Sequence, residues 1–141
     1  MLETSILDQV RSVFRQLEAR YIFHITYHPE HEQAEELIEF LNDVASCSDK
    51  LSCRLTTTDE PKLEFTLLKE GEETGIKFRA IPNGHEFTSL LLAVLNADEK
   101  GKNLPDEAIA RRIKALQGPI RLQTYVSLTC TNCPDVVQAL N

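Results

Sequence analysis

The spacing of hydrophobic residues changes several times along the first part of the chain, and each change predicts a new element. Apolar residues three or four positions apart indicate amphipathic helices, whereas runs rich in β-branched and aromatic residues indicate strands. The predicted elements are a helix over 4–20, a strand over 21–27, a helix over 34–44, a strand over 51–57, two strands over 62–69 and 75–81 joined by a turn at 70–74, and a helix over 87–95.

A strand–helix–strand unit followed by a hairpin and a closing helix is the element order of the thioredoxin fold. We therefore expect residues 1–100 to form a complete α/β, thioredoxin-like unit, with its first two strands parallel and its hairpin antiparallel. After a linker over 98–103, a helix with Pro105 near its start is followed by a strand over 120–128 and a further helical pattern. Residues 101–141 repeat the opening helix, strand and helix, and we interpret them as the beginning of a second thioredoxin-like unit.

Composition and charge narrow the function classes. With 141 residues, 42% of them hydrophobic, the chain can form a core of ordinary size. Its net charge of −7 is uneven, because residues 1–100 carry 19 acidic and 10 basic side chains whereas residues 101–141 carry 3 and 5. An acidic majority repels phosphate backbones, so nucleic acid is not an expected partner. The sequence contains no membrane-spanning run and opens without a signal-peptide pattern, so we expect no membrane partner and a cytoplasmic location.

Two cysteines, Cys130 and Cys133, are the strongest chemical signal in the chain. They follow the apolar run over 120–128 and fall where a helix begins, a position in which unpaired backbone N–H groups and the helix dipole stabilise a thiolate. A thiolate attacks disulfides, and the two intervening residues allow Cys133 to close back onto Cys130. Zinc sites use the same spacing but need two further ligands. The strand-then-helix context therefore favours a redox pair over zinc.

The other cysteines and histidines make a poor second pair of zinc ligands. Cys47 and Cys53 are separated by five residues, and we interpret them as small buried or half-buried hydrophobic residues. His28 and His31 lie in a predicted loop, and we interpret them as solvated. When the two units are aligned, these histidines occupy the positions of the cysteine pair, so the first unit lacks a dithiol and is expected to be a redox-inactive scaffold.

Two motifs give the chain a resemblance to a known family. Residues 129–141 read T-C-T-N-C-P-D-V-V-Q-A-L-N, and residues 84–90 read G-H-E-F-T-S-L. Both motifs, in this order, are similar to those of the amino-terminal domain of the flavoprotein component, the F subunit, of bacterial alkyl hydroperoxide reductase. That domain is a fused pair of thioredoxin-like folds with one functional dithiol. The resemblance therefore implies that the second fold is cut off here soon after its dithiol.

The resemblance also implies an activity, partners and residue roles. It implies a protein-disulfide reductase relay that passes electrons from NADH and FAD, bound by a flavin domain of the same polypeptide, to a partner peroxiredoxin, the C subunit, which reduces hydroperoxides. No glycine-rich dinucleotide fingerprint occurs here, so we expect no cofactor and no metal in this chain, and FAD and NADH in the full-length protein. Cys130 would be the attacking thiol, Cys133 the resolving thiol, and Glu86 the proton acceptor and donor.

Alternatives stay open at this point. The same cysteines could stabilise a non-catalytic zinc module, or the chain could be an inert docking module. Glu86 could simply be a residue in the first turn of a helix, where the dipole favours an acid by roughly 0.3–1 kcal/mol. An uncovered apolar strand over 120–128 would expose backbone and side chains, so we expect the first unit or another copy to cover it, which makes a homodimer a candidate partner.

Overall fold

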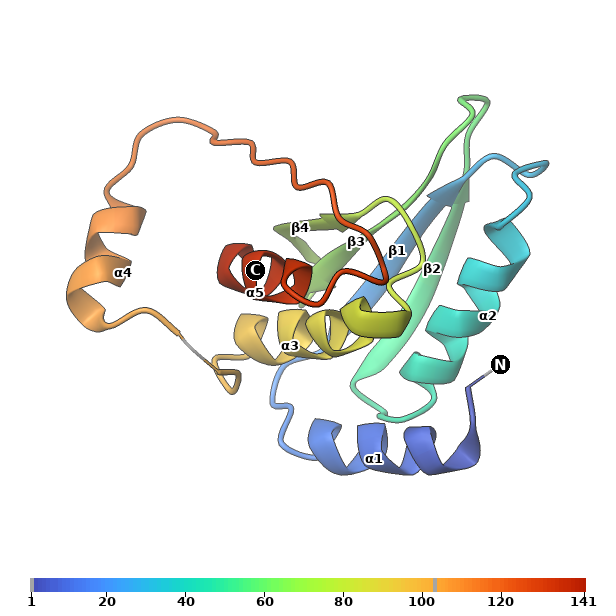
Figure 1. Ribbon diagram of the computed structural model, residues 1–141, viewed down its shortest axis with the longest axis horizontal. Coiled ribbons are helices and arrows are strands. Elements are labelled where there is room, and N and C mark those ends of the chain that lie inside the picture. The colour runs from blue at the N-terminus through green and yellow to red at the C-terminus, as the bar shows by residue number, and fades with distance from the viewer. Residues whose placement is uncertain (1, 103) are drawn as a thin grey trace.

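The structure, a computed structural model that describes residues 2–102 and 104–141, places most elements where the hydrophobic pattern predicts them (Figure 1). The last residue of the linker expected over 98–103 lies outside the described residues. The elements are α1 (Thr4–Phe14), β1 (Tyr21–Tyr27), α2 (Ala34–Ala45), β2 (Leu51–Thr57), β3 (Leu63–Lys69), β4 (Glu72–Phe78), the 3₁₀ helix η1 (Gly84–Glu86), α3 (Phe87–Ala97), α4 (Glu107–Lys114) and α5 (Cys133–Leu140).

The four strands form one mixed sheet in the order β2-β1-β3-β4. β1 and β2 are parallel because the crossover through α2 returns the chain to the same end of the sheet. β3 runs antiparallel to β1, and β4 runs antiparallel to β3 as the second strand of a hairpin. This arrangement confirms the predicted α/β topology.

The core lies between one face of this sheet and the helices α2 and α3 (Figure 1), and it also includes Val10 and Phe14 of α1. Alternate residues of the central strands point into it, and Phe23 of β1 meets Phe65 of β3 edge to face, with ring centroids 6.0 Å apart. Phe40 of α2 packs in the same way against Phe87 at the start of α3, with centroids 5.9 Å apart. The two helices therefore cover the same face of the sheet. Because η1 runs directly into α3, the packing of α3 on the core also positions η1.

The first helix ends at Phe14, so the predicted extension to residue 20 is wrong. The backbone N–H groups of Glu18 and Ala19 donate instead to the buried carboxylate of Asp98, each at 3.0 Å, and the Tyr21 hydroxyl donates to the same carboxylate at 3.0 Å. Burial alone would raise the pKa of Asp98, but these three hydrogen bonds outweigh it and lower that pKa below its ordinary value. A partner some 80 residues away thus ends the helix.

The hairpin is tighter than the sequence suggests. Only Glu70 and Gly71 form its turn, with φ angles of 52° and 84°, which is the positive-φ pair of a two-residue hairpin turn. β4 therefore begins at Glu72, and the strand predicted over 75–81 is shifted by three residues.

The predicted strand over 120–128 is also wrong, because this segment is not paired with any strand of the described chain. Residues 1–100 do not cover this segment either, because Leu122 is 68% exposed and Tyr125 is 89% exposed. A period of two in the side chains specifies which face of a strand is apolar, but a strand forms only where a neighbouring edge completes its hydrogen bonds. Among the described residues, no helix is long and apolar enough to cross a membrane.

Candidate active site

The two predicted site cysteines, Cys130 and Cys133, are joined as a disulfide at the start of α5. Cys133 is the first residue of α5, and Pro134 follows it in the first turn, where a helix needs no N–H donor. Cys130 precedes the helix, not within its first turn as predicted, and its Sγ accepts the backbone N–H of Cys133 at 3.2 Å. The helix N-terminus therefore faces the Cys130 sulfur. In the reduced chain, the same N–H group and the helix dipole favour a thiolate at this sulfur.

The 84–90 motif contacts the backbone of Leu128, the residue just before the 129–141 motif. The N–H of His85 donates to the carbonyl oxygen of Leu128 at 3.2 Å. Gly84 has a φ of 57°, and a Cβ at this position would stand 3.0 Å from the same oxygen. A glycine is therefore needed at residue 84 both for its backbone conformation and for this close approach. The 84–90 motif thus positions the segment that leads into the disulfide.

Ser89 of α3 anchors the other end of α5. Its hydroxyl oxygen accepts a hydrogen bond from Gln138 Nε2 at 3.2 Å, and its backbone carbonyl accepts one from Asn141 Nδ2 at 3.4 Å. Ser89 is fully buried, and α3 and α5 lie side by side (Figure 1). Ser89 is not among the predicted site residues, although a serine within the apolar run of α3 is a usable signal.

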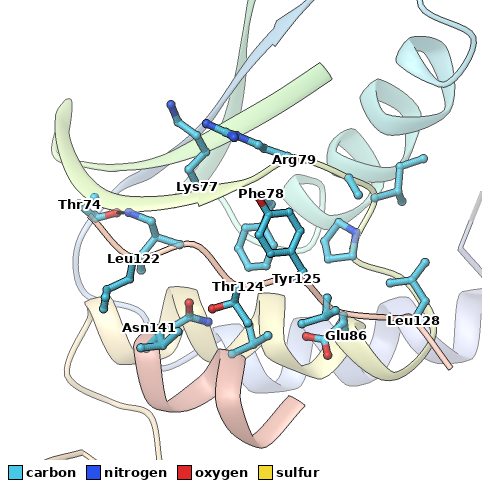
Figure 2. Close-up of a pocket in the computed structure, with 18 of the residues that line it drawn as sticks. Thr74, Lys77, Phe78, Arg79, Glu86, Leu122, Thr124, Tyr125, Leu128 and Asn141 are labelled. Atoms are coloured by element: carbon cyan, nitrogen blue, oxygen red, sulfur yellow. Dashed lines mark hydrogen bonds between the residues drawn. The ribbon is translucent and has the colours of Figure 1, made fainter. Parts of the chain in front are cut away.

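Glu86 is buried, with 2% of its surface exposed, at the junction of η1 and α3. Neither carboxylate oxygen has a hydrogen-bond partner among the residues that the structure describes. The side chain lines a cavity of about 740 Å³ that is bounded by β4, the 120–128 segment and α5, and Figure 2 shows it at the Leu128 end. Val137, one helical turn beyond Cys133, lines the same cavity.

An unpartnered buried carboxyl is costly, and such a group in a native protein calls for an explanation, of which a catalytic role is one. η1 and α5 are in contact, so Glu86 and the disulfide lie around the same helix, although no hydrogen bond joins them. The structure joins two of the three predicted site residues, Cys130 and Cys133, directly. It places the third, Glu86, on η1, an element that contacts their helix.

The remaining cysteines are free and do not pair with each other. Burial raises the pKa of the half-buried Cys53 to about 11. Burial also raises the pKa of Cys47, although Arg11 and Ser46 oppose this effect. Both thiols are therefore mostly protonated near neutral pH and are poor nucleophiles.

His28 and His31 shape the turn that leads into α2. The Nδ1 atom of His28 accepts the N–H of Glu30 at 3.1 Å, and that of His31 accepts the N–H of Gln33 at 3.2 Å. In the part of the chain that the structure describes, no cluster of three or more His, Cys, Asp or Glu side chains could hold a metal ion.

Three features define a thioredoxin-like protein: the helical crossover between parallel strands, the antiparallel hairpin, and the Cys-x-x-Cys disulfide at the start of a helix.

Comparison with known proteins identifies the family within this class. The chain is 38% identical to the F subunit of alkyl hydroperoxide reductase from Staphylococcus epidermidis over 144 aligned residues, which cover the whole chain and 27% of that relative. It superposes on the crystal structure of the NTD_N/C domain of the alkylhydroperoxide reductase AhpF from Enterococcus faecalis with a TM-score of 0.82 and 31% identity, covering 99% of this chain and 72% of that one. The chain belongs to the family of the amino-terminal domain of AhpF, the F subunit of alkyl hydroperoxide reductase.

Two further comparisons set the limits of this assignment. A protein disulfide oxidoreductase from Aeropyrum pernix shares the fold, with a TM-score of 0.80, 16% identity, and coverage of 98% of this chain and 65% of that one. No family model matches the chain. The chain spans roughly a quarter of the length of the curated AhpF relatives, 27% in the case above.

Proposed function

We propose that this chain is the dithiol-bearing part of a thiol–disulfide relay, an oxidoreductase that passes two electrons to a peroxiredoxin. The observation that carries the proposal is the Cys130–Cys133 disulfide at the start of α5, with the N–H of Cys133 on Cys130 Sγ. Membership of the AhpF family supports it, because the relatives are named as alkyl hydroperoxide reductase subunits. The free thiols, whose pKa is raised by burial, are unsuited to the role.

Electron delivery takes two exchange steps. The Cys130 thiolate first attacks one sulfur of the substrate disulfide, forming a mixed disulfide and releasing one substrate thiolate, which takes up a proton. The Cys133 thiolate then attacks Cys130 Sγ, which releases the second substrate thiolate and re-forms the Cys130–Cys133 disulfide. Two electrons have then passed from the chain to the substrate, whose two thiolates take up protons from the solvent so that it leaves as a dithiol.

Glu86 is our candidate for the proton acceptor of the second step. Cys133 must lose its proton before it attacks, and Glu86 is the buried, unpartnered carboxyl on η1, the element that packs against α5. The same carboxyl would return the proton when the disulfide is next reduced.

We place the source of electrons outside these residues. In this proposal a dithiol of a flavin- and NADH-binding portion reduces the Cys130–Cys133 disulfide, becoming a disulfide itself, and the peroxiredoxin reduced by this chain then consumes a hydroperoxide. FAD and NADH are accordingly assigned to that portion, and this chain contributes the dithiol, the helix N-terminus that favours its thiolate, and the buried carboxyl.

Reduction of a chromogenic aromatic disulfide by the pre-reduced chain tests the exchange chemistry. We expect Cys130→Ser to abolish fast exchange and Cys133→Ser to accumulate the mixed disulfide, whereas the matched control Cys53→Ser should react like the unaltered chain. Fast exchange that survives Cys130→Ser, or that is lost with Cys53→Ser, would overturn the proposal.

Glu86→Gln tests the proton acceptor. If Glu86 serves the dithiol, the variant should exchange more slowly at neutral pH, by about tenfold, while its thermal midpoint is nearly unchanged. If Glu86 is only a helix-dipole partner, the variant should lose a few tenths of a kcal/mol of stability and keep its rate. Stopped-flow rates between about pH 6 and 9 separate these outcomes, and an unchanged rate profile defeats the catalytic role.

A further inference from the structure

The continuous helical segment formed by η1 and α3 holds the dithiol-bearing part of the chain at two points. The first point lies before the dithiol, where the N–H of His85 donates to the carbonyl oxygen of Leu128 at 3.2 Å. The second lies after it, where Ser89 accepts a hydrogen bond from Gln138 at 3.2 Å and another from Asn141 at 3.4 Å. A single contact would leave α5 free to pivot about it. Two contacts on one helical segment fix both the position and the direction of α5.

Ser89 is the polar exception among the buried residues of α3. The others are Leu90, Leu92, Ala93, Val94 and Leu95. Ser89 itself has 0% of its surface exposed. A buried hydroxyl that lacks a hydrogen-bond partner is costly, and an alanine carries no such cost. What Ser89 adds over an alanine is therefore the bond that its Oγ accepts from Gln138 Nε2 of α5.

α5 turns one stripe of its surface toward η1 and α3. The half-buried residues of 133–141 recur at the spacing of an amphipathic helix: Cys133, Pro134, Val137, Gln138 and Asn141. Cys133 begins this stripe, and the two residues that bind Ser89 end it. Val137, in the middle, lines the cavity that Glu86 also lines. A shift of α5 along or around α3 would therefore carry Cys133 with it relative to Glu86.

Glu86 lies between the two holding points of the helical segment. It follows His85 directly and precedes Ser89 by three residues, so Glu86 and Ser89 lie on the same side of this segment. Glu86, Leu128 and Asn141 line the same cavity, and Figure 2 shows Glu86 between the other two. The contacts on either side of Glu86 therefore set how α5 lies relative to its carboxyl group.

We propose that Ser89 is a positioning residue of the disulfide exchange, which fixes α5 along α3 so that Cys133 is presented to Glu86. The inference rests on the proposed role of Glu86 as proton acceptor. Ser89 itself gains and loses no proton, and it acts only through the placement of α5.

The step that Ser89 serves is the attack of Cys133 on the mixed disulfide. The proton of the Cys133 thiol passes to the Glu86 carboxylate, and Cys133 Sγ then forms a bond to Cys130 Sγ. The bond from Cys130 Sγ to the substrate sulfur breaks, and the substrate sulfur leaves with the electron pair as a thiolate. A misplacement of about 1 Å can slow a step of this kind by about a hundredfold, so a hydrogen bond at the far end of α5 can affect its rate.

A pH jump isolates this step in the full 141-residue chain. The reduced chain forms a mixed disulfide between Cys130 and an aromatic thiol at about pH 4, where the Cys133 thiol stays protonated. The solution is then brought to about pH 7, and release of the coloured aromatic thiolate measures the attack of Cys133. We expect Ser89→Ala to slow this release by about threefold, which is less than the effect of Glu86→Gln because the Leu128 contact remains.

Gln138→Ala removes the other partner of the same bond from the half-buried side of α5, without altering α3. It should slow the release as much as Ser89→Ala does, and the double variant should be no slower than either single variant. In a chain that already carries Glu86→Gln, Ser89→Ala should change the rate by less than about 1.5-fold, because the proton acceptor that it positions is gone.

Val94→Ala is the matched control for loss of stability. Val94 is fully buried on the same helix and belongs to the hydrophobic core, so its truncation should lower the thermal midpoint at least as much as Ser89→Ala does. We expect it to leave the release rate within about 1.5-fold of the unaltered chain. Equal slowing by Val94→Ala and Ser89→Ala would show that stability alone sets the rate, and would overturn the proposal.

The remaining outcomes separate this inference from the proposed function. If Glu86→Gln slows the release but Ser89→Ala and Gln138→Ala do not, the positioning role is wrong and the proton acceptor stands. The positioning role is also wrong if Ser89→Ala slows the release equally with and without Glu86→Gln. If Glu86→Gln leaves the release unchanged, the proton acceptor is wrong, and the positioning role is overturned with it.

Discussion

Replacement of Gly84 by alanine tests how the 84–90 motif positions the disulfide. Gly84 has a φ of 57°, and in this left-handed conformation a residue with a Cβ costs roughly 1–2 kcal/mol. The new methyl group would also stand 3.0 Å from the carbonyl oxygen of Leu128, so Leu128 must move. That movement lengthens and weakens the hydrogen bond from the His85 N–H, which is worth up to about 1 kcal/mol. We therefore expect Gly84→Ala to lower the free energy of unfolding by about 2–3 kcal/mol.

Gly75→Ala is the matched control, because it isolates the backbone strain. Gly75 has a φ of 87° within β4, and a Cβ there would meet no atom within 4 Å. Its substitution should cost only the roughly 1–2 kcal/mol of the left-handed conformation. Urea unfolding followed by circular dichroism gives both free energies.

The functional consequence separates the two variants further. Movement of Leu128 displaces Cys130 from the N–H of Cys133, so the Cys130 thiolate of the reduced Gly84→Ala chain loses part of its stabilisation. We expect its attack on an aromatic disulfide to slow by about threefold, which corresponds to roughly 0.6 kcal/mol. Gly75→Ala should react at the unaltered rate. If the two variants lose equal stability and react equally fast, the contact with Leu128 does not position the site.

Two further predictions concern titrating groups. Asp98→Asn should lower the free energy of unfolding by about 2–3 kcal/mol at pH 7, because it weakens three hydrogen bonds to a charged carboxylate. Since the pKa of Asp98 is lowered in the folded chain, its stabilisation is present above about pH 4 and is lost as the pH falls through the folded pKa, so urea unfolding should show the variant and the unaltered chain converging in acid. In the reduced chain at pH 7, iodoacetamide should label Cys130 before Cys53 and Cys47, whose pKa values are raised by burial. Peptide mapping that finds Cys53 labelled first would contradict the assignment.

The sequence pattern predicted those helices and strands whose bounds are set by residues close together in the chain. β1 has the predicted bounds because its apolar alternation matches the face that α2 and α3 cover. β2 also has the predicted bounds, although Leu51 is its only buried residue. The end of α1 was missed because Asp98, which accepts the N–H groups of Glu18 and Ala19, lies 80 and 79 residues further along the chain, respectively. The strand over 120–128 was predicted from a correct side-chain pattern, but the pattern contains no information on whether a neighbouring edge is present.

The candidate site divides in the same way. The cysteine pair was evident because its chemistry lies within four consecutive residues, and the 84–90 motif drew attention to Glu86. What that motif does was not evident, since the contacts of Gly84 and His85 with Leu128 join parts of the chain that are far apart in sequence. Ser89 was overlooked for the same reason, because its partners Gln138 and Asn141 follow it by 49 and 52 residues.

Trapping of a mixed disulfide with a peroxiredoxin tests the proposed relay most directly. The Cys133→Ser chain, reduced and then freed of reductant, is mixed with an alkyl hydroperoxide reductase peroxiredoxin in its disulfide form, and the products are separated without reductant and mapped by mass spectrometry. We predict one covalent adduct, attached through Cys130 and released by dithiothreitol, and no adduct from a chain that also carries Cys130→Ser. An adduct through Cys53, or no adduct together with failure of the unaltered reduced chain to reduce the peroxiredoxin, would contradict the relay.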